Sequence, residues 1–454
     1  MTESSKAQSH SNDTASTLEA VYQSLTSEDD GRVCKDIPDA ACRHQPKNVV
    51  THVISLTSTK IADGLIDPKL ILSWLMSALG ASSFMIGLLV PIREAGALLP
   101  QLFTAGALRR LPQRKWAWAL GSFVQGSCAI GMALSAVFFE PQFAGWSILG
   151  LLAILAVARS VCSVSYKDVL GKTVSKSMRG RTTGLAASIA AGAVIAYALL
   201  LSSGWIERQS LVIGGLLVAG ALWIFASVMF SSLAEEKGAT AGGGNPLTVA
   251  RENLSLLVKD MQLVRFIGVR GLLMATALAP PFMVALVGDS GVGDRLEDTG
   301  IANVLSGLGP LVLASALASL LSSYFWGHLS DRSSRKVLIY SGLFAALALA
   351  LTATFDWQGW LRHAAVLPGL LFVLMIAYHG VRLGRSTHLV DMADEDNRAV
   401  YTALSNTIIG LLLLAGAVFS VIAEYFGLRV VMVVMTIMCL LSSWVALGLK
   451  EVQE

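Results

Sequence analysis

The sequence predicts an all-α integral membrane protein with twelve transmembrane helices in two pseudo-symmetric six-helix bundles. Only 14% of its 454 residues are charged and 54% are hydrophobic, whereas a soluble domain carries about 25% charged residues. Apolar runs of about 20 residues recur along the chain, and each can cross a hydrocarbon core about 30 Å thick. Such runs must be helical, because lipid offers the backbone no hydrogen-bond partner. A charged loop is also repeated in the two halves.

The repeated loop indicates a duplicated bundle. Its first copy runs from Gly106 to Lys115 (GALRRLPQRK), and its second copy, 221 positions later, runs from Gly327 to Lys336 (GHLSDRSSRK). Each copy lies between two long apolar runs. Parallel six-helix halves are the architecture of a large class of transporters.

The chain divides into four parts. Residues 1–50 are polar and are expected to form a disordered cytoplasmic tail. Bundles are expected at 51–231 and 263–450, joined by a cytoplasmic linker at 232–262 whose apolar spacing predicts an amphipathic surface helix. A tight external turn is expected at 80–83. The expected spans are 54–79, 82–106, 116–138, 144–166, 183–203, 209–231, 263–287, 302–326, 337–355, 364–383, 400–423 and 429–449.

Lysine and arginine residues gather in alternate loops. The basic loops are 104–115, 165–181, 232–265, 327–336 and 382–398. The loops between them carry only Arg208, Arg295, Arg362 and Arg429. Because positive residues stay on the cytoplasmic side, both termini and both copies of the repeated loop are expected to face the cytoplasm.

The repeated loop resembles the signature that the major facilitator superfamily carries between helices 2 and 3 and again between helices 8 and 9. The second copy matches this signature at Gly327, Asp331, Arg332, Arg335 and Lys336. The first copy keeps Gly106, Arg114 and Lys115, but Arg110 stands where the signature has Asp. The resemblance covers roughly 54–450 and implies a twelve-helix transporter, here of a bacterial inner membrane, that acts as a monomer.

The resemblance also implies that both copies act as a conformational latch. A glycine lets two helices approach closely, an aspartate can interact with a neighbouring helix end, and the basic residues can pair with carboxylates in one conformation. The alternative is a basic loop that only sets the topology. That alternative is stronger for the first copy, because Arg110 cannot act as an Asp.

Charged residues inside the predicted spans are costly and therefore tend to be paired and functional. Lys60, Asp63 and Asp67 share one helical face, and Pro68 predicts a kink or break at that point. The second span carries Arg93 and Glu94. The candidates for proton coupling are Asp63, Asp67, Arg93 and Glu94, and the candidates for the substrate cavity are Lys60, Arg159, Arg270, Asn303, Tyr378 and His379.

Two interpretations of these charges remain open. In the first, protonation of Asp63 or Glu94 releases a partner such as Arg93 or Lys60, and the change in charge decides which side of the transporter is open. In the second, the same residues form salt bridges that only hold helices together. Arg159 is expected near the cytoplasmic end of its span, which favours the second interpretation for that residue.

The sequence therefore predicts a secondary active transporter that moves a small anionic or zwitterionic solute by alternating access, coupled to protons. One alternative is an exporter of amphipathic or drug-like compounds by proton antiport. Another, from a different class, is a non-transporting membrane sensor or assembly partner, which only the tail at 1–50 favours.

Several other classes of function lack their residue patterns. The chain has no P-loop, and no nucleophile–base pair appears, so neither ATP-driven transport nor an enzyme is expected. Cys34, Cys42 and His44 are too few for a metal site, and no disulfide is predicted. No basic patch is interleaved with aromatic residues, so nucleic acid is not an expected partner. The expected partners are the lipid bilayer, a small solute and protons, with no cofactor.

Overall fold

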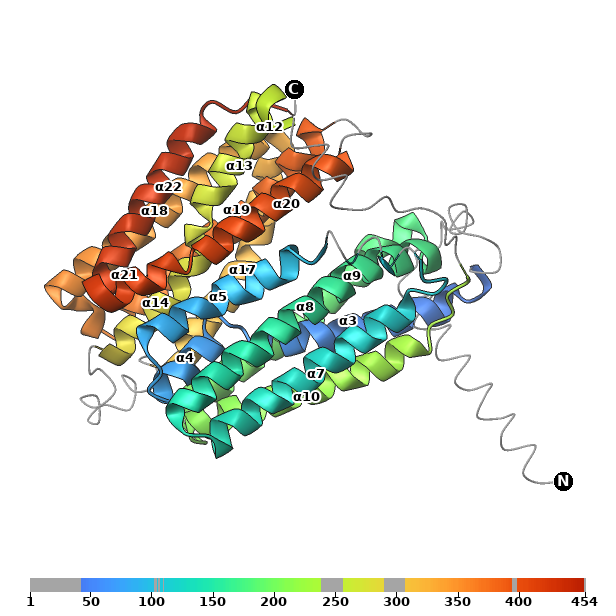
Figure 1. Cartoon of the computed structure of the whole chain (residues 1–454), viewed down its shortest axis with the longest axis horizontal. Helices are drawn as coiled ribbons and strands as arrows, with labels where there is room; N and C mark the ends of the chain where they lie inside the picture. The colour runs from blue at the N-terminus through green and yellow to red at the C-terminus, as the bar shows by residue number, and fades with distance from the viewer. Residues whose placement is uncertain are drawn as a thin grey trace.

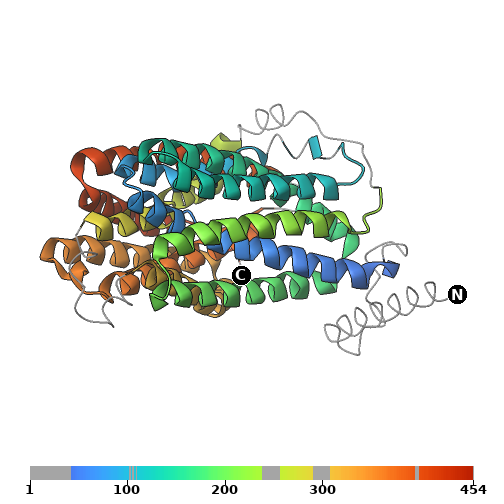
Figure 2. The same ribbon diagram turned by 90° about the horizontal axis from the view of Figure 1, so that it is seen from below.

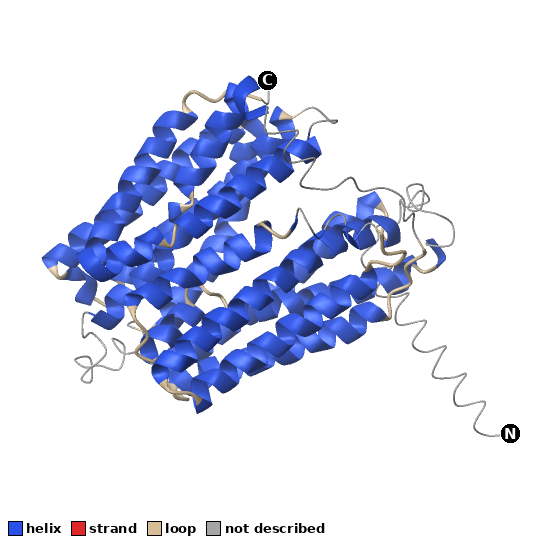
Figure 3. Cartoon of the chain, in the orientation of Figure 1, coloured by secondary structure: helices blue, strands red, loops and turns tan. Residues whose placement is uncertain are grey.

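The computed structural model describes residues 42–101, 104, 107–108, 110–237, 256–289, 307–393 and 398–452. Within these ranges every regular element is a helix (Figure 3). The first half contains α3 (Gln45–Leu65), α4 (Ile71–Ala78), α5 (Ser83–Leu98), α7 (Lys115–Phe138), α8 (Pro141–Thr173), α9 (Lys176–Ser203) and α10 (Arg208–Ser231). The second half contains α12 (Leu256–Lys259), α13 (Met261–Leu273), α14 (Ala275–Asp289), α17 (Leu308–Arg332), α18 (Ser334–Gln358), the 3-10 helix η1 (Trp360–Arg362), α19 (Val366–Met392), α20 (Arg398–Ala415), α21 (Val418–Phe426) and α22 (Leu428–Ala446).

These helices give twelve membrane segments. Ten helical stretches of the described chain are long and apolar enough to cross a bilayer, counting α13 with α14 and α20 with α21 as one stretch each. The remaining two segments are the broken pair α3–α4 and the shorter α5. The predicted all-α, twelve-helix class is therefore confirmed, and the chain is a multi-pass membrane protein.

The first segment is broken where the sequence predicts it. Helix α3 ends at Leu65, and Pro68 has no backbone N–H to continue the helical ladder. The carboxylate of Asp67 accepts a hydrogen bond from the backbone N–H of Lys69 at 2.8 Å, and its carbonyl oxygen accepts from the backbone N–H of Ile71 at 2.8 Å. Asp67 therefore organises the break and starts α4.

A tight turn follows α4, as expected at 80–83. Gly80 adopts a φ of 77°, a conformation that only glycine adopts without strain. The hydroxyl of Ser82 then accepts the backbone N–H of Met85 at 3.4 Å and caps α5. The turn lets α5 run back antiparallel to α4.

Several predicted spans are too short, and one predicted packing role is wrong. Helix α3 begins at Gln45, inside the tail expected at 1–50, and α19 continues to Met392, beyond the expected end at 383, so Arg382 and Arg385 lie in a helix and not in a loop. Helix α8 continues to Thr173, beyond the expected end at 166, so Arg159 lies near its middle and not near its end. Helix α17 continues to Arg332, so Gly327 lies inside it. A Cβ added at Gly327 would meet nothing within 4 Å, and this glycine therefore permits no close helix contact. Residues 302–306 and Gly106 lie outside the described residues.

The helices form two groups. Figure 1 separates α7, α8 and α10 from α18, α20 and α22, with α5 between the groups. Figure 2 shows that the helices of both groups run along a common direction. The halves contact each other through α5, which packs against α14, α20 and α21, and through α9, which packs against α17.

The two halves meet at one end of the molecule. We call the end that carries the loops 110–115, 174–175 and 333 the basic end, and the other the opposite end. At the opposite end, the backbone N–H of Phe84 lies 3.3 Å from a carboxylate oxygen of Glu424, and a Cβ at Gly309 would collide with Ser202. The ribbons of the two groups diverge toward the basic end (Figure 1). The described contacts therefore close the opposite end.

Candidate functional site

Five charged side chains from four segments meet within the membrane region of the first half. Asp63 lies near the end of α3, Lys69 lies in the break before α4, Arg93 and Glu94 lie on α5, and Arg159 lies on α8. We call these five residues the charged cluster. The break at Pro68 is what brings Lys69 to the same region as the charges of α5.

Asp63 is shared by two arginines. A guanidinium nitrogen of Arg93 lies 3.3 Å from one oxygen of its carboxylate, and Arg159 pairs with the other oxygen. One carboxylate can neutralise only one of the two guanidinium charges. Protonation of Asp63 would therefore release both arginines at once, since a neutral carboxyl no longer attracts them.

Lys69 links the two halves. Its ammonium group lies 3.8 Å from a carboxylate oxygen of Glu94 and 3.7 Å from the ring centroid of Tyr378 on α19. The Lys69 side chain is only 8% exposed, so both the ion pair and the cation–π contact are largely shielded from water. This lysine was not among the candidates chosen from the sequence.

A small polar pocket lies beside the charged cluster. It encloses about 250 Å³ between α3, α7, α8 and α9, and Lys60 and Arg159 are part of its wall. Gln125, Tyr166 and Lys167 contribute further polar groups. Two of the predicted substrate-cavity residues therefore share one pocket, whose volume suits a group smaller than a drug-sized molecule.

The second half contributes cations to the same region. Arg382 and Arg385 of α19 lie within electrostatic range of Glu94. His379 is half-buried on α19, with Lys69 and Arg382 as its charged neighbours. Arg270 lies on α13, where it contacts Ser405 and Asn406 of α20 and belongs to no ion pair in the described part of the chain. Asn303 lies outside the described residues.

The first copy of the repeated loop is bound within its own half. Arg114 pairs with Asp168 of α8, and Lys115 donates to the carbonyl oxygens of Ser231 at 3.0 Å and Leu233 at 2.8 Å. Asp168 therefore supplies a carboxylate to this loop although Arg110 has replaced the signature Asp.

Glu235 anchors the same loop from the end of α10. Its carboxylate is fully buried and accepts the backbone N–H groups of Arg114 at 3.1 Å and Lys115 at 2.8 Å. It also pairs with Lys172 at 3.3 Å, which itself pairs with Asp168 at 3.0 Å. The result is a network that ties α7, α8 and α10 together at the basic end.

The second copy makes different contacts. Arg335 donates to the carbonyl oxygen of Leu449 at 3.1 Å, and the hydroxyl of Ser333 donates to Glu451 at 2.6 Å. The backbone N–H of Lys336 donates to Ser333, while Arg332 is exposed. The side chain of Asp331 lies outside what the structure describes. These contacts, like those of the first copy, stay within one half.

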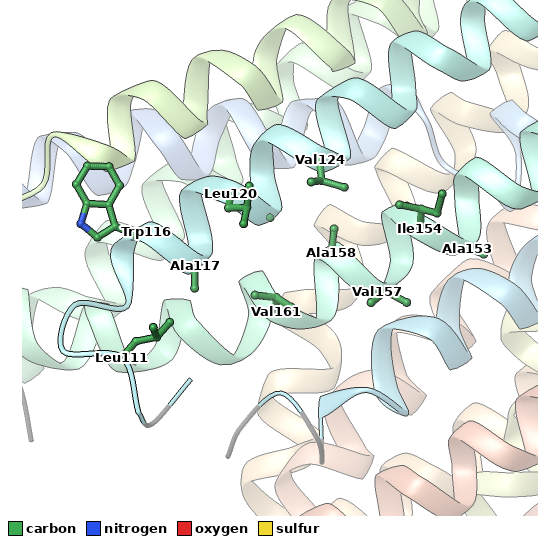
Figure 4. Close-up of a pocket in the computed structure, with 11 residues that line it drawn as sticks. Leu111, Trp116, Ala117, Leu120, Val124, Ala153, Ile154, Val157, Ala158 and Val161 are labelled. Carbon is green, nitrogen blue, oxygen red and sulfur yellow. The ribbon is translucent and has the colours of Figure 1, made fainter. Parts of the chain in front are cut away.

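An apolar pocket of about 700 Å³ lies apart from the charged cluster, on the surface of α7 and α8 (Figure 4). Figure 4 shows Trp116, Leu120, Ile154 and Val157 around it, and all four are exposed in the protein alone. Side chains of this kind on a membrane helix face lipid. This pocket therefore contains none of the charges that could couple transport to protons.

Lys69 and Arg385 are the members of the site that sequence reasoning missed. Helical spacing connects Lys60, Asp63 and Asp67, but it cannot be continued through the break at Pro68. A usable signal was present, because Lys69 directly precedes the apolar run of α4 and a lysine there needs a partner. Asp168 and Glu235 were missed as partners of the repeated loop because sequence spacing cannot pair distant residues.

The described residues contain no group of three His, Cys, Asp or Glu side chains that could hold a metal ion. Cys42 is joined in a disulfide, which corrects the expectation of no disulfide. Cys128, Cys162 and Cys439 are free and buried. Buried free cysteines of this kind behave as small apolar residues.

Comparison with known proteins agrees with this architecture. The model of the Major Facilitator Superfamily matches residues 266–454. No curated protein matches the chain. Among solved structures, the nucleoside transporter NupG has a TM-score of 0.66 at 13% identity, covering 88% of this chain and 98% of that one.

Two further structures have the same fold. A POT family transporter in complex with 5-aminolevulinic acid has a TM-score of 0.67 at 9% identity, covering 88% of this chain and 95% of its own. A D-xylose-proton symporter has a TM-score of 0.62 at 12% identity, covering 89% and 98%. At these identities the likeness establishes the fold and not the solute.

Fold and family match together define the class: this is a multi-pass membrane transporter and not an enzyme. The second half of the chain matches the Major Facilitator Superfamily directly, and the two halves together have that family's fold.

Proposed function

We propose that the protein is a secondary active transporter that moves a small anionic or zwitterionic solute in exchange or symport with protons. The observation that carries this proposal is the sharing of Asp63 by Arg93 and Arg159 from two other helices. Protonation of a carboxylate that holds two cations in a membrane region would change the partners of both, and such intramembrane charges are usually functional.

The surplus of cations supports an anionic or zwitterionic solute. Lys60, Lys69, Arg93, Arg159, Arg270, Arg382 and Arg385 lie in the membrane region, and the carboxylates described there are Asp63, Asp67 and Glu94. Uncompensated charge in a membrane protein is unfavourable. A bound solute that carries a carboxylate or phosphate would compensate it.

Glu94 and Lys69 can link proton binding to a change in the contacts between the two halves. When Glu94 carries a negative charge it holds Lys69 beside α5, while the ring of Tyr378 holds the same ammonium from the second half. Protonation of Glu94 would remove one of these two attractions. The balance of contacts between the halves would then depend on the proton.

The predicted topology supports an assignment of the described conformation to one stage of the transport cycle. If the basic loops are cytoplasmic, as the positive-inside rule predicts, the opposite end is external. The contacts of Phe84 with Glu424 and of Gly309 with Ser202 then close the external side. We therefore assign the inward-facing conformation. We also propose that the protein acts as a monomer in a bacterial inner membrane, with both termini cytoplasmic.

The fold relatives are compatible with this class of solute. One is a D-xylose-proton symporter by name, and another was solved with 5-aminolevulinic acid, a molecule that carries both an amine and a carboxylate. The same fold can accommodate a sugar or an amino acid, because the solute is selected by the residues of the site and not by the scaffold. The surplus of cations in this chain favours the acidic solute.

Proton movement in proteoliposomes tests the proposal. The wild type is compared with Asp63→Asn and Glu94→Gln while anionic, zwitterionic, neutral and cationic solutes are added outside in turn. We expect an acidic solute to produce a proton signal that at least one of the two variants loses. Solute flux without proton movement, unchanged in both variants, would refute coupling through these carboxylates.

A second candidate is an exporter of amphipathic compounds. The apolar pocket between Trp116 and Val161 favours it, because an amphipathic compound could reach this surface of α7 and α8 from the membrane. The same assay with lipophilic cations separates the candidates. A proton signal with these cations, and none with organic acids, would select the exporter. If no solute is transported, the remaining interpretation is a non-transporting membrane sensor or assembly partner.

A further inference from the structure

Arg270 is a buried cation whose contacts are neutral. It is only 6% exposed. Its guanidinium donates to the hydroxyl of Ser405 and, at 3.1 Å, to the side-chain oxygen of Asn406, and it lies 5.7 Å from the ring centroid of Phe266. Its Nε is buried without a hydrogen-bond partner. One donor of a fixed guanidinium therefore remains unused.

No carboxylate compensates this charge in the described part of the chain, where none of the ion pairs includes Arg270. Its charged neighbour is Arg385, another cation. In the first half, by contrast, Arg93 and Arg159 contact Asp63 and Lys69 contacts Glu94. A buried charge without a partner is costly, and the residues that the structure describes supply no anion to compensate Arg270.

Two further arginines lie on α19, and Arg385 is close enough to Arg270 to affect it electrostatically. Arg385 is half-buried, and Arg382, one turn earlier, is exposed. Arg385 also lies within electrostatic range of Glu94. An anion that enters between the halves from the basic end would meet Arg385 first and Arg382, one turn deeper, next.

We propose that Arg270 and Arg385 bind the acidic group, a carboxylate or a phosphate, of a small organic anion, with Asn406 as a neutral donor. This inference rests on the proposed function and assigns the solute's acidic group to the second half. The side-chain oxygen of Asn406 faces Arg270, which leaves its amide N–H groups free to donate. Ser405 and Asn406 hold the guanidinium in place without neutralising it.

The proposal gives the two halves separate tasks. The carboxylates that can accept a proton lie on α3 and α5, and the arginines that bind the anion lie on α13 and α19. Because Arg385 acts on Glu94 as well as on Arg270, the anion and the proton would compete for or share the same cation. Anion binding and protonation of Glu94 are then thermodynamically linked.

Ligand binding to the purified full-length protein in detergent tests the proposal without a proton gradient. The thermal midpoint is measured with increasing succinate, glycerol phosphate or inorganic phosphate, and with xylose and choline as neutral and cationic comparisons. We expect at least one acidic compound to raise the midpoint of the wild type. Succinate and glycerol phosphate distinguish a carboxylate site from a phosphate site.

Arg270→Gln should weaken the binding of that compound about tenfold to hundredfold, because a charge-assisted hydrogen bond and its charge are lost. The matched control is Arg265→Gln on the same helix, since Arg265 is exposed and donates to the carbonyl oxygen of Gly448. Arg385→Gln and Asn406→Leu keep Arg270 and cover the case in which Arg270→Gln does not fold. Both should bind the anion more weakly.

Unchanged binding in Arg270→Gln and Arg385→Gln, or no response of the wild type to any acidic compound, would overturn the inference. Binding that survives Asp63→Asn and is lost in Arg270→Gln would support it, whatever the coupling ion. If the acidic compounds bind in this way and proteoliposomes show no proton movement, the proposed coupling fails and the anion site stands. If proton-linked flux of the acid persists in Arg270→Gln, the anion site fails and the transporter stands.

Discussion

The two halves share a scaffold but differ in how they compensate charge. In the first half, Arg93 and Arg159 contact Asp63, and Lys69 contacts Glu94. In the second half, the partners described for Arg270 are a hydroxyl, an amide and an aromatic ring. The helices and the basic loops therefore recur in both halves, while the carboxylates described in the membrane region, Asp63, Asp67 and Glu94, lie in the first half. The difference shows that pseudo-symmetry of the backbone does not extend to the chemistry of the membrane region.

The largest expected effect on transport comes from removing the carboxylate that compensates two arginines in the first half. Asp63→Asn leaves Arg93 and Arg159 without a carboxylate, and we expect proton-linked solute flux to fall about 100-fold, equivalent to about 2.7 kcal/mol. Asp63→Glu keeps the charge and the proton acceptor and should keep measurable coupling with a shifted pH dependence. Flux is measured in proteoliposomes between pH 5 and pH 8. Equal flux in wild type and Asp63→Asn across this range would show that the shared carboxylate is structural.

The next effect concerns the contact that joins the halves. Lys69→Met keeps an unbranched side chain of similar length but loses the ion pair with Glu94 and the cation–π contact with Tyr378, a contact worth about 2 kcal/mol when shielded from water. We expect flux to fall about tenfold. Tyr378→Phe is the matched control, since it keeps the aromatic ring, and it should retain most of the flux. If Lys69→Met transports as well as the wild type, the link between the halves is dispensable.

A smaller effect is expected at the basic end, where the first copy of the repeated loop is anchored. Glu235→Gln weakens two hydrogen bonds to backbone N–H groups and removes the pair with Lys172, a loss of about 1.5–3 kcal/mol in unfolding free energy. Glu236→Gln changes an exposed neighbour and should leave stability unchanged. Thermal unfolding of the purified variants measures both. Identical midpoints for Glu235→Gln and wild type would mean that the network contributes no stability.

The smallest effect is a pH dependence in the second half. Burial alone would raise the pKa of Asp260, but the hydroxyl of Tyr401 and the backbone N–H groups of Leu263 and Gln262 outweigh burial and hold the pKa below its ordinary value of 3.8. The stabilisation is therefore present above about pH 3.8 and is lost as the pH falls through the lowered folded pKa.

Asp260→Asn can keep a cap on α13 but no longer titrates. We expect the wild type to lose up to about 1 kcal/mol more stability than this variant between pH 5 and pH 3, an amount typical of a helix cap. Unfolding is followed by intrinsic fluorescence at each pH. Parallel stability curves for the two proteins would contradict the assignment of this titration to Asp260.

Local features of this fold could be predicted from the sequence. Proline chemistry predicted the break at Pro68, and apolar length predicted most of the twelve segments. The repeated loop placed the first two segments and the turn at Gly80 between them. The ends of α8 and α17 could not be predicted in this way. Both helices extend past the hydrophobic core into the basic end, where polar residues continue the helix without any change in backbone pattern.

The candidate site was predictable only in part. Asp63, Arg93 and Glu94 stood out because charge in a membrane span is rare, and the structure brings them together. The pairing of Asp63 with Arg159 was not expected, because the predicted span placed Arg159 too near the end of its helix. Lys69 was missed because its direction depends on the geometry after Pro68. Such contacts depend on how helices cross, which a single sequence does not encode in its spacing.

The surplus of cations among the membrane segments also has an electrical consequence. A potential of 100 mV changes the energy of one elementary charge by about 2.3 kcal/mol when that charge crosses the whole field. A carrier whose moving region holds positive charge would therefore be drawn toward the negative side of the membrane when empty. A bound anion would cancel part of that force. On the proposed function, the resting voltage of the cell would then govern the return of the empty carrier more strongly than the step that carries the solute.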